Sequence, residues 1–366
     1  MSLSCGIIGL PNVGKSCVFN ALTNAGAESA NYPFCTIDPN YGVVTVPDSR
    51  LDQLAELLQP EQVIPATIAF VDIAGLVKGA SEGKGKGNAF LSHIREADLL
   101  IHVVRCFEDP DVVHVEPDLN PLRDIDIIES ELLFKDLETL ERRIENARNM
   151  AKSGERTLRL QVELLLELKK HIEKGLPVRS WPQWDPRHPA LSNLFFLTTK
   201  RIIYLCNIAE QNLPDGKDSP LVRAVIDHAN TIGSPVIVAC AQLEAEIAEL
   251  EDEEKADFLE AIGLEESGFN RLVRASYREL DRITFFTTRS SQLRAWTVRN
   301  GTKAPQAAGV IHTDMEKGFI RAETIDWHQL LETGSEATAR ERGLIRSEGR
   351  EYPVRDGDVI LFRFNV

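Results

Sequence analysis

The stretch GLPNVGKS at residues 9–16 constrains the fold of this chain more than any other feature. It matches the phosphate-loop pattern GxxxxGK[ST] at every fixed position, and it lies between an apolar run and the helix-forming run SCVFNALTNA. Glycines let backbone N–H groups wrap phosphates, and the following helix N-terminus adds partial positive charge. We therefore expect Lys15 to bridge the β- and γ-phosphates of a nucleotide and Ser16 to bind Mg²⁺. If the match were a chance occurrence in an ordinary turn, neither the preceding apolar run nor the following helical run would be expected.

Two further segments are expected to complete a magnesium site. VDIAG at residues 71–75 has an aspartate at the end of a strand and a glycine three residues later. Asp72 is expected to contact Mg²⁺ through water, and the Gly75 N–H to contact the γ-phosphate. Between this segment and the phosphate loop, NYPFCTIDPN at residues 31–40 offers Thr36 as a further hydroxyl ligand of the metal. Taken alone, Thr36 would be an ordinary loop threonine.

Apolar, β-branched runs recur along the chain with helical segments between most of them. This alternation predicts an α/β fold with a mostly parallel sheet, whose ligands bind at the carboxyl ends of the strands. The expected strands include residues 5–10, 66–75, 99–104, 201–207 and 235–241, with residues 41–47 as an edge strand.

A long helical segment interrupts this pattern. Apolar residues from Leu133 to Ala151 alternate spacings of four and three, KSGE at 152–155 breaks the series, and a second helical run continues to Ile172. This pattern predicts an antiparallel helical hairpin, which would be either a packing arm or a partner-binding arm. We expect a nucleotide-binding domain at residues 1–127 and 195–280, an inserted helical domain at 128–194, and a C-terminal α+β module at 281–366.

The composition describes an ordinary water-soluble chain. Of its 366 residues, 43% are hydrophobic and 27% are charged, and the net charge is −15. This charge argues against nonspecific nucleic-acid binding, although Lys317, Arg321, Arg355 and Arg363 would suit a local basic face for RNA. The six cysteines form no CxxC pair, and neither a signal peptide nor a membrane-spanning run is expected. We expect a cytoplasmic protein.

The segment expected to read the base departs from the guanine pattern. Guanine-specific proteins carry Asn-Lys-x-Asp after the corresponding strand, whereas this chain has Asn207-Ile208-Ala209-Glu210. CAQLE at 240–244 stands where Ser-Ala-Lys is usual. We expect Asn207 to bond the purine N7 and 6-amine, Ile208 to pack on the purine face, and the longer Glu210 to avoid the guanine-reading position. The sequence therefore predicts a preference for ATP over GTP.

The motifs GLPNVGKS, NYPFCTIDPN, DIAGLVKGAS, NIAE, HTDMEKGFIRAE and DGDVILFRFNV together resemble the YchF/Obg-like ATPase family over essentially the whole chain. The resemblance implies a P-loop domain of the Obg group, a helical insertion and a C-terminal TGS domain of β-grasp type. It also implies ATP hydrolysis in association with ribosomes, with phosphate contacts along Asn12, Val13 and Gly14. Cys17 departs from the family, which usually has a hydroxyl residue there.

The catalytic group is less directly indicated. Leu76 follows DIAG where many GTPases have the glutamine that orients water. His114 lies in a loop after the fourth strand, and the resemblance also points to it, although a solvated loop histidine is the alternative. By resemblance Asn12 would support K⁺ as a second cation; its alternative role is to hydrogen-bond the loop backbone.

We therefore expect an ATP hydrolase that acts as a nucleotide-controlled factor on the ribosome and its RNA. The alternatives are a GTP-hydrolysing switch of the Obg type and a binding module in which turnover is incidental. A small-molecule kinase is disfavoured, because neither an arginine-rich lid nor an acceptor pocket is apparent. The pattern indicates neither membrane association nor sequence-specific DNA binding.

Overall fold

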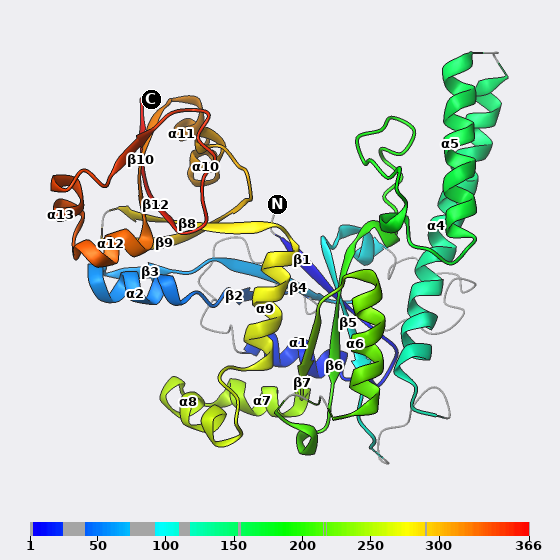
Figure 1. Cartoon of the computed structure of the whole chain (residues 1–366), viewed down its shortest axis with the longest axis horizontal. Coiled ribbons are helices and arrows are strands. Elements are labelled where there is room, and N and C mark those ends of the chain that lie inside the picture. Colours follow the sequence, from blue (N-terminus) through cyan, green and yellow to red (C-terminus); the bar gives the residue numbers. More distant parts are fainter. Residues whose placement is uncertain are drawn as a thin grey trace. The chain divides into compact units, whose positions relative to one another are not determined.

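The computed structural model (Figure 1) describes residues 3–24, 41–73, 92–109, 118–152, 155–214, 216, 218–289 and 291–365. Contacts between residues divide the chain into two compact units. The first comprises residues 1–42 and 69–272, and the second comprises residues 43–68 and 273–366. Among the described residues, no helix combines the length and apolar character needed to cross a bilayer.

The first unit is built on a six-stranded sheet in the order β2-β4-β1-β5-β6-β7. The printed pairings of β4, β1, β5, β6 and β7 are all parallel, as expected, and β2 lies at the edge. The strands are β1 Ser4–Ile8, β2 Tyr41–Thr45, β4 Thr67–Asp72, β5 Leu99–Arg105, β6 Arg201–Asn207 and β7 Val236–Ala239. Strands β5 and β6 are almost entirely buried and mostly apolar. This sheet therefore fixes the positions of the loops that follow the carboxyl ends of its strands.

Helices α1 Lys15–Asn24 and α6 Pro220–Ile232 connect strands of this sheet. Helices α7 Ala241–Glu249, α8 Asp252–Ala261 and α9 Gly268–Glu279 follow its last strand, β7. The buried Glu244 carboxylate accepts hydrogen bonds from the N–H groups of Gly268 at 2.5 Å and Phe269 at 3.3 Å. The glutamate of the CAQLE segment therefore caps α9 and fixes α7 against it.

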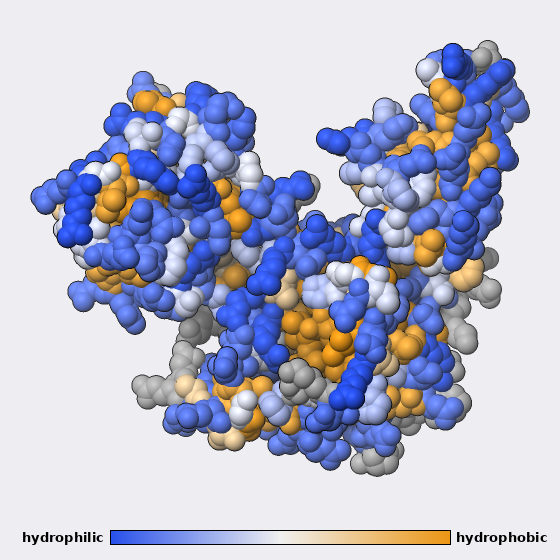
Figure 2. Space-filling model, viewed as in Figure 1, coloured by the Kyte–Doolittle hydropathy of each residue, from blue (hydrophilic) through white to orange (hydrophobic). Residues whose placement is uncertain are grey.

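The helical insertion is an antiparallel hairpin of α4 Pro121–Ala151 and α5 Arg156–Ile172. Its core contains the expected apolar residues, with Leu140, Ile144, Leu165 and Leu168 at most 4% exposed. Apolar side chains appear along the hairpin within a mostly hydrophilic surface (Figure 2). The hairpin begins earlier than expected, because α4 is one continuous helix from Pro121, and it belongs to the same unit as the sheet.

The return from the hairpin to the sheet is fastened by one buried carboxylate. Asp136 of α4 accepts hydrogen bonds from the Leu197 N–H at 2.7 Å, the Thr198 N–H at 2.8 Å and the Thr198 hydroxyl at 2.6 Å. Leu197 and Thr198 lie in a short 3₁₀ turn, Leu197–Thr199, immediately before β6. The side chain of Asp136 therefore fixes where the chain re-enters the sheet.

The second unit has its own six-stranded sheet, in the order β11-β10-β12-β8-β9-β3. β8 and β9 form an antiparallel hairpin, β12 pairs in parallel with β8, and β10 is antiparallel to β12, which is a β-grasp arrangement. Its strands are β3 Gln62–Ile64, β8 Arg282–Arg289, β9 Gln292–Arg299, β10 Phe319–Asp326, β11 Arg346–Glu348 and β12 Asp358–Phe364. Its helices are α2 Ser49–Leu58, α10 Ala304–Ile311, α11 Thr313–Lys317, α12 Trp327–Thr333 and α13 Glu336–Glu341.

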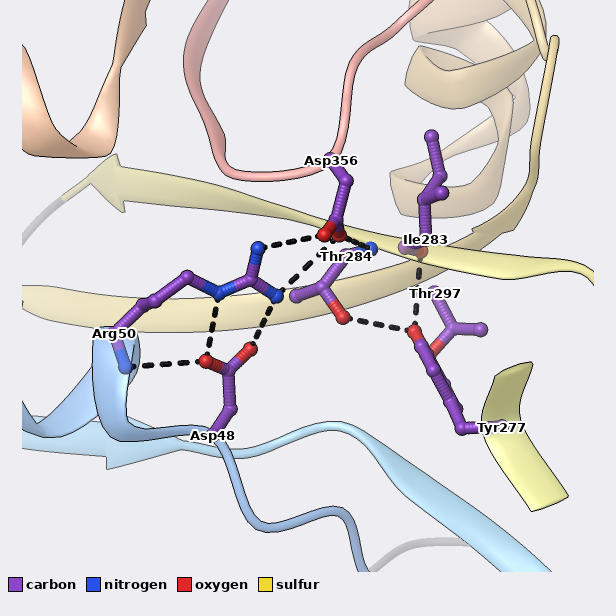
Figure 3. Close-up of polar contacts among 7 residues, drawn as sticks. All are labelled: Asp48, Arg50, Tyr277, Ile283, Thr284, Thr297 and Asp356. Atoms are coloured by element: carbon purple, nitrogen blue, oxygen red, sulfur yellow. Dashed lines mark hydrogen bonds and ion pairs between the residues drawn. The ribbon is translucent and has the colours of Figure 1, made fainter. Parts of the chain in front are cut away.

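Residues 43–68 group with this second unit, whereas the sequence analysis placed them in the nucleotide-binding domain. β3 pairs with β9, and Arg50 of α2 bonds both Asp48, at 2.8 Å, and Asp356, at 2.8 Å (Figure 3). The Asp356 carboxylate also accepts the Thr284 N–H at 2.8 Å. These pairings are long-range in sequence, so the local pattern could not reveal them.

Candidate nucleotide-binding site

The predicted phosphate loop joins β1 to α1, and its glycines have conformations that other residues avoid. Gly9 has φ +152° and Gly14 has φ +98°. A Cβ at Gly9 would lie 2.6 Å from the Val103 carbonyl oxygen, and one at Gly14 would lie 2.4 Å from the Asn207 side chain. Asn12 also has a left-handed backbone, at φ +60°, and Val13 is buried. The loop is therefore a tight turn held against β5 and β6.

Lys15 is held inside this turn. Its side-chain ammonium donates to the Leu10 carbonyl oxygen at 2.8 Å, and the residue is only 8% exposed. Burial lowers the pKa of Lys15, while the nearby Asp72 carboxylate opposes that shift. An ammonium held by the loop itself is positioned to meet phosphate oxygens that approach the loop.

Ser16 and Asp72 are brought together although 56 positions separate them. The Ser16 hydroxyl donates to Asp72 Oδ2 at 3.3 Å. Asp72 Oδ1 is buried and has no hydrogen-bond partner among the described residues. A hydroxyl beside an incompletely bonded carboxylate is an oxygen donor set that fits Mg²⁺, directly or through water.

Asn207 connects the phosphate loop to the loop after β7. Its amide nitrogen donates to the Val13 carbonyl oxygen at 3.0 Å, and its Oδ1 accepts the Ala241 N–H at 3.0 Å. An amide group has two N–H donors, so one remains for a purine N7. Asn207 Oδ1 already accepts the Ala241 N–H. The expected hydrogen bond from a purine 6-amine would therefore be the second that this oxygen accepts.

The other base-site residues differ in exposure. Ile208 is 2% exposed, and a Cβ added at Gly216 would lie 3.4 Å from its side chain. The Ile208 side chain is therefore packed against protein in this structure, and its expected contact with the purine face stays a prediction. Glu210, in the 3₁₀ turn Glu210–Asn212, is exposed.

Cys17 faces the same loop as Asn207. Its thiol donates to the Ala241 carbonyl oxygen at 3.2 Å, and burial raises the pKa of the thiol, with Cys240 adding to the shift. The side chain that replaces the usual hydroxyl is therefore a neutral thiol bonded to protein. Thr36, Gly75, Leu76 and His114 lie outside the described residues.

One buried polar residue beside this site was not singled out for it. His102 of β5 is the register partner of Ile8 and is 1% exposed, and its Nδ1 has no hydrogen-bond partner among the described residues. Burial lowers the pKa of His102 to about 3, so the ring beneath the phosphate loop is neutral. The sequence could not predict that His102 lies beside the phosphate loop, because a single histidine within an apolar strand looks like an ordinary core residue.

Comparison with known proteins identifies both parts of the chain. A family model described as "50S ribosome-binding GTPase" matches residues 4–140. A second model, for the C-terminal part of YchF-type GTPases and described as a protein of unknown function (DUF933), matches residues 282–365.

Full-length relatives cover the whole chain. The chain is 49% identical over 366 residues to the "Ribosome-binding ATPase YchF" of Bacillus subtilis, with complete coverage of both chains. It is 44% identical to "Obg-like ATPase 1" of Pongo abelii, which it covers to 93%. The solved structure of the Schizosaccharomyces pombe YchF GTPase superimposes with a TM-score of 0.88 at 35% identity, covering 99% of this chain and 98% of that one. These matches confirm the expected fold class and the resemblance: the chain belongs to the YchF/Obg-like ATPase family.

Proposed function

We propose that this protein is an ATP hydrolase whose nucleotide state controls its docking on the ribosome in the cytoplasm. The observation that carries the proposal is that Lys15 and Ser16, at the start of α1, meet Asp72, at the carboxyl end of β4. The names of the relatives, ribosome-binding ATPases, supply the partner and the nucleotide.

The residues of the chain have distinct roles in this mechanism. Lys15 and the loop N–H groups hold the β- and γ-phosphates, so that the scissile phosphate is oriented. Ser16, Asp72 and, by prediction, Thr36 would hold Mg²⁺, which would supply positive charge to neutralise the phosphate oxygens. His114 stays our prediction for the group that orients the attacking water, and the Gly75 N–H for the γ-phosphate contact. A K⁺ requirement through Asn12 likewise stays a prediction.

The first test measures nucleotide-dependent docking. Full-length protein is sedimented with purified bacterial 70S ribosomes in Mg²⁺ buffer containing ADP or a nonhydrolysable ATP analogue. We expect the two nucleotides to give different cosedimentation, and ribosomes to stimulate hydrolysis. Lys15→Ala should abolish both effects by removing a charge-assisted phosphate contact, whereas Lys170→Ala, an exposed lysine on α5, should retain them. Wild-type protein that never cosediments would refute the ribosome assignment.

A second measurement separates this proposal from a GTP-hydrolysing switch, an alternative favoured by the family model's description. Glu210 replaces the aspartate that reads guanine, and its exposed side chain is one methylene longer. We expect ATP to bind more tightly than GTP by about 1–3 kcal/mol, the scale of an unsatisfied polar group. Calorimetric titration with both nucleotides decides between them. Glu210→Asp should shift the preference only partly, and tighter GTP binding by wild type would favour the alternative.

A further inference from the structure

Three arginines of the second unit converge on one carboxylate. Glu323 of β10 has a side chain only 9% exposed. Arg363 of β12 donates to it twice, with Nε–Oε1 3.1 Å and Nη2–Oε2 3.2 Å. Arg321 bonds Oε1 at 3.1 Å, and Arg340 of α13 bonds Oε2 at 3.2 Å. We call Arg321, Arg340 and Arg363, held by Glu323, the arginine cluster.

The fold of the unit explains why these residues meet. Arg321 and Arg363 are register partners on the antiparallel strands β10 and β12, and Glu323 lies two residues beyond Arg321 on the same face. Helix α13 then brings Arg340 to that face. Arg321 and Arg363 were among the basic residues noted in the sequence. Arg340 was missed, because its place depends on how α13 packs.

The cluster has more positive charge and more donors than its carboxylate can use. The three arginine side chains are 52%, 57% and 48% exposed, so each guanidinium retains N–H groups that face solvent. Three cations around one anion leave two positive charges on a chain whose net charge is −15. The carboxylate of Glu336, also on α13, is already bonded by the Thr288 hydroxyl at 2.6 Å.

We propose that the arginine cluster binds the phosphodiester backbone of ribosomal RNA, with Glu323 as the residue that positions the three guanidinium groups. This inference rests on the proposed docking to the ribosome and names a surface for it. Guanidinium groups donate in a planar fork that matches phosphate oxygens. Because Glu323 already restricts the arginine side chains, less side-chain freedom is lost when phosphate binds. The half-exposed guanidinium groups can donate to the phosphates of an extended backbone.

Substitution of the positioning residue separates this idea from simple charge attraction. Glu323→Gln adds one positive charge to the surface, so nonspecific attraction predicts equal or tighter binding. If Glu323 instead positions the arginines, the variant should bind ribosomes and RNA at least about threefold more weakly, which is less than the loss of one whole phosphate contact. Full-length variants are titrated against 70S ribosomes and against protein-free 23S ribosomal RNA, at several salt concentrations, with a nonhydrolysable ATP analogue present.

Two arginine variants complete the design. Arg363→Gln should weaken binding to both targets by about tenfold. It should also reduce the slope of log affinity against log salt concentration by about one. Arg363→Lys keeps the charge but loses the fork, and should bind at least about threefold more weakly; it also replaces Glu323→Gln as the test if that variant unfolds. Arg342→Gln, an exposed arginine at the end of α13, makes the same charge change outside the cluster and should change affinity less than twofold.

The outcomes distinguish this inference from the proposed function. If wild-type protein binds ribosomes and all cluster variants bind equally well, the cluster assignment is overturned while ribosome docking stands. Equal losses in Arg363→Gln and Arg342→Gln would indicate bulk charge and also overturn it. Weaker binding to ribosomes with unchanged binding to free RNA would assign the cluster to a ribosomal protein instead of RNA. If wild-type protein does not bind ribosomes, the proposed function itself fails.

Discussion

At the scale of single residues, Asn207 shows how one side chain can serve both the fold and the site. The sequence motif predicts that it contacts the base of the nucleotide. The structure adds that its amide joins the Val13 carbonyl oxygen to the Ala241 N–H, both at 3.0 Å. Since the residue is 6% exposed, removal of the amide would leave two buried backbone groups without these partners.

We therefore predict that Asn207→Ala lowers the free energy of unfolding by about 1–3 kcal/mol. It should also weaken ATP and ADP binding alike, because the phosphate loop loses its contact with β6. Chemical denaturation and calorimetric titration measure the two effects. Asn230→Ala, at an exposed position on α6, is the matched control and should change neither. A stable Asn207→Ala protein that retains tight binding would contradict this role.

At the scale of secondary-structure elements, the hairpin depends on its anchor at Asp136. Burial raises the pKa of Asp136 from 3.8 to about 6, although the hydrogen bonds from Thr198 and Leu197 oppose the shift. A carboxyl with a raised pKa in the folded protein binds its proton more tightly there than in the unfolded chain. The stability that it contributes is thus complete below about pH 4 and declines as the pH rises through 6.

Asp136→Asn removes this titration and also replaces one of the two accepting oxygens with an NH₂ group, which cannot accept from Leu197 or Thr198. We expect the variant to be less stable than wild type by about 2 kcal/mol or more at pH 5. The difference should shrink as the pH rises to 7.5, because only wild type loses stability over that interval. Denaturant unfolding at both pH values checks the prediction, with Asp126→Asn, an exposed position on the same helix, as control. A difference that grows with pH would show that the sign is wrong.

At the scale of the whole molecule, the candidate nucleotide site and the arginine cluster belong to different units. The net charge of −15 limits unspecific attraction to RNA, so the proposed binding of RNA would depend on local surfaces such as the arginine cluster. The described residues of the candidate nucleotide site, among them Lys15, Asp72 and Asn207, belong to the first unit. The segment of residues 43–68 belongs to the second unit, although in sequence it lies between the predicted metal ligands Thr36 and Asp72.

The local sequence determined the phosphate loop, the parallel strands, the hairpin seam and the family. Each depends on contacts or conformations within a few residues, such as the glycine turn at 9–14 or the apolar periodicity of α4. These features are therefore readable without the fold.

Only the tertiary structure decided which distant groups meet. Several interactions join residues from separate elements. Arg50 bonds Asp48 and Asp356, Asp136 bonds Leu197 and Thr198, and Arg340 bonds Glu323. The near-complete burial of Ile208 is of the same kind. The hydrogen-bond partner of a polar residue cannot be predicted from the local sequence, because the packing of whole elements decides which residues meet. A turn or a helix, in contrast, is determined largely by its own residues.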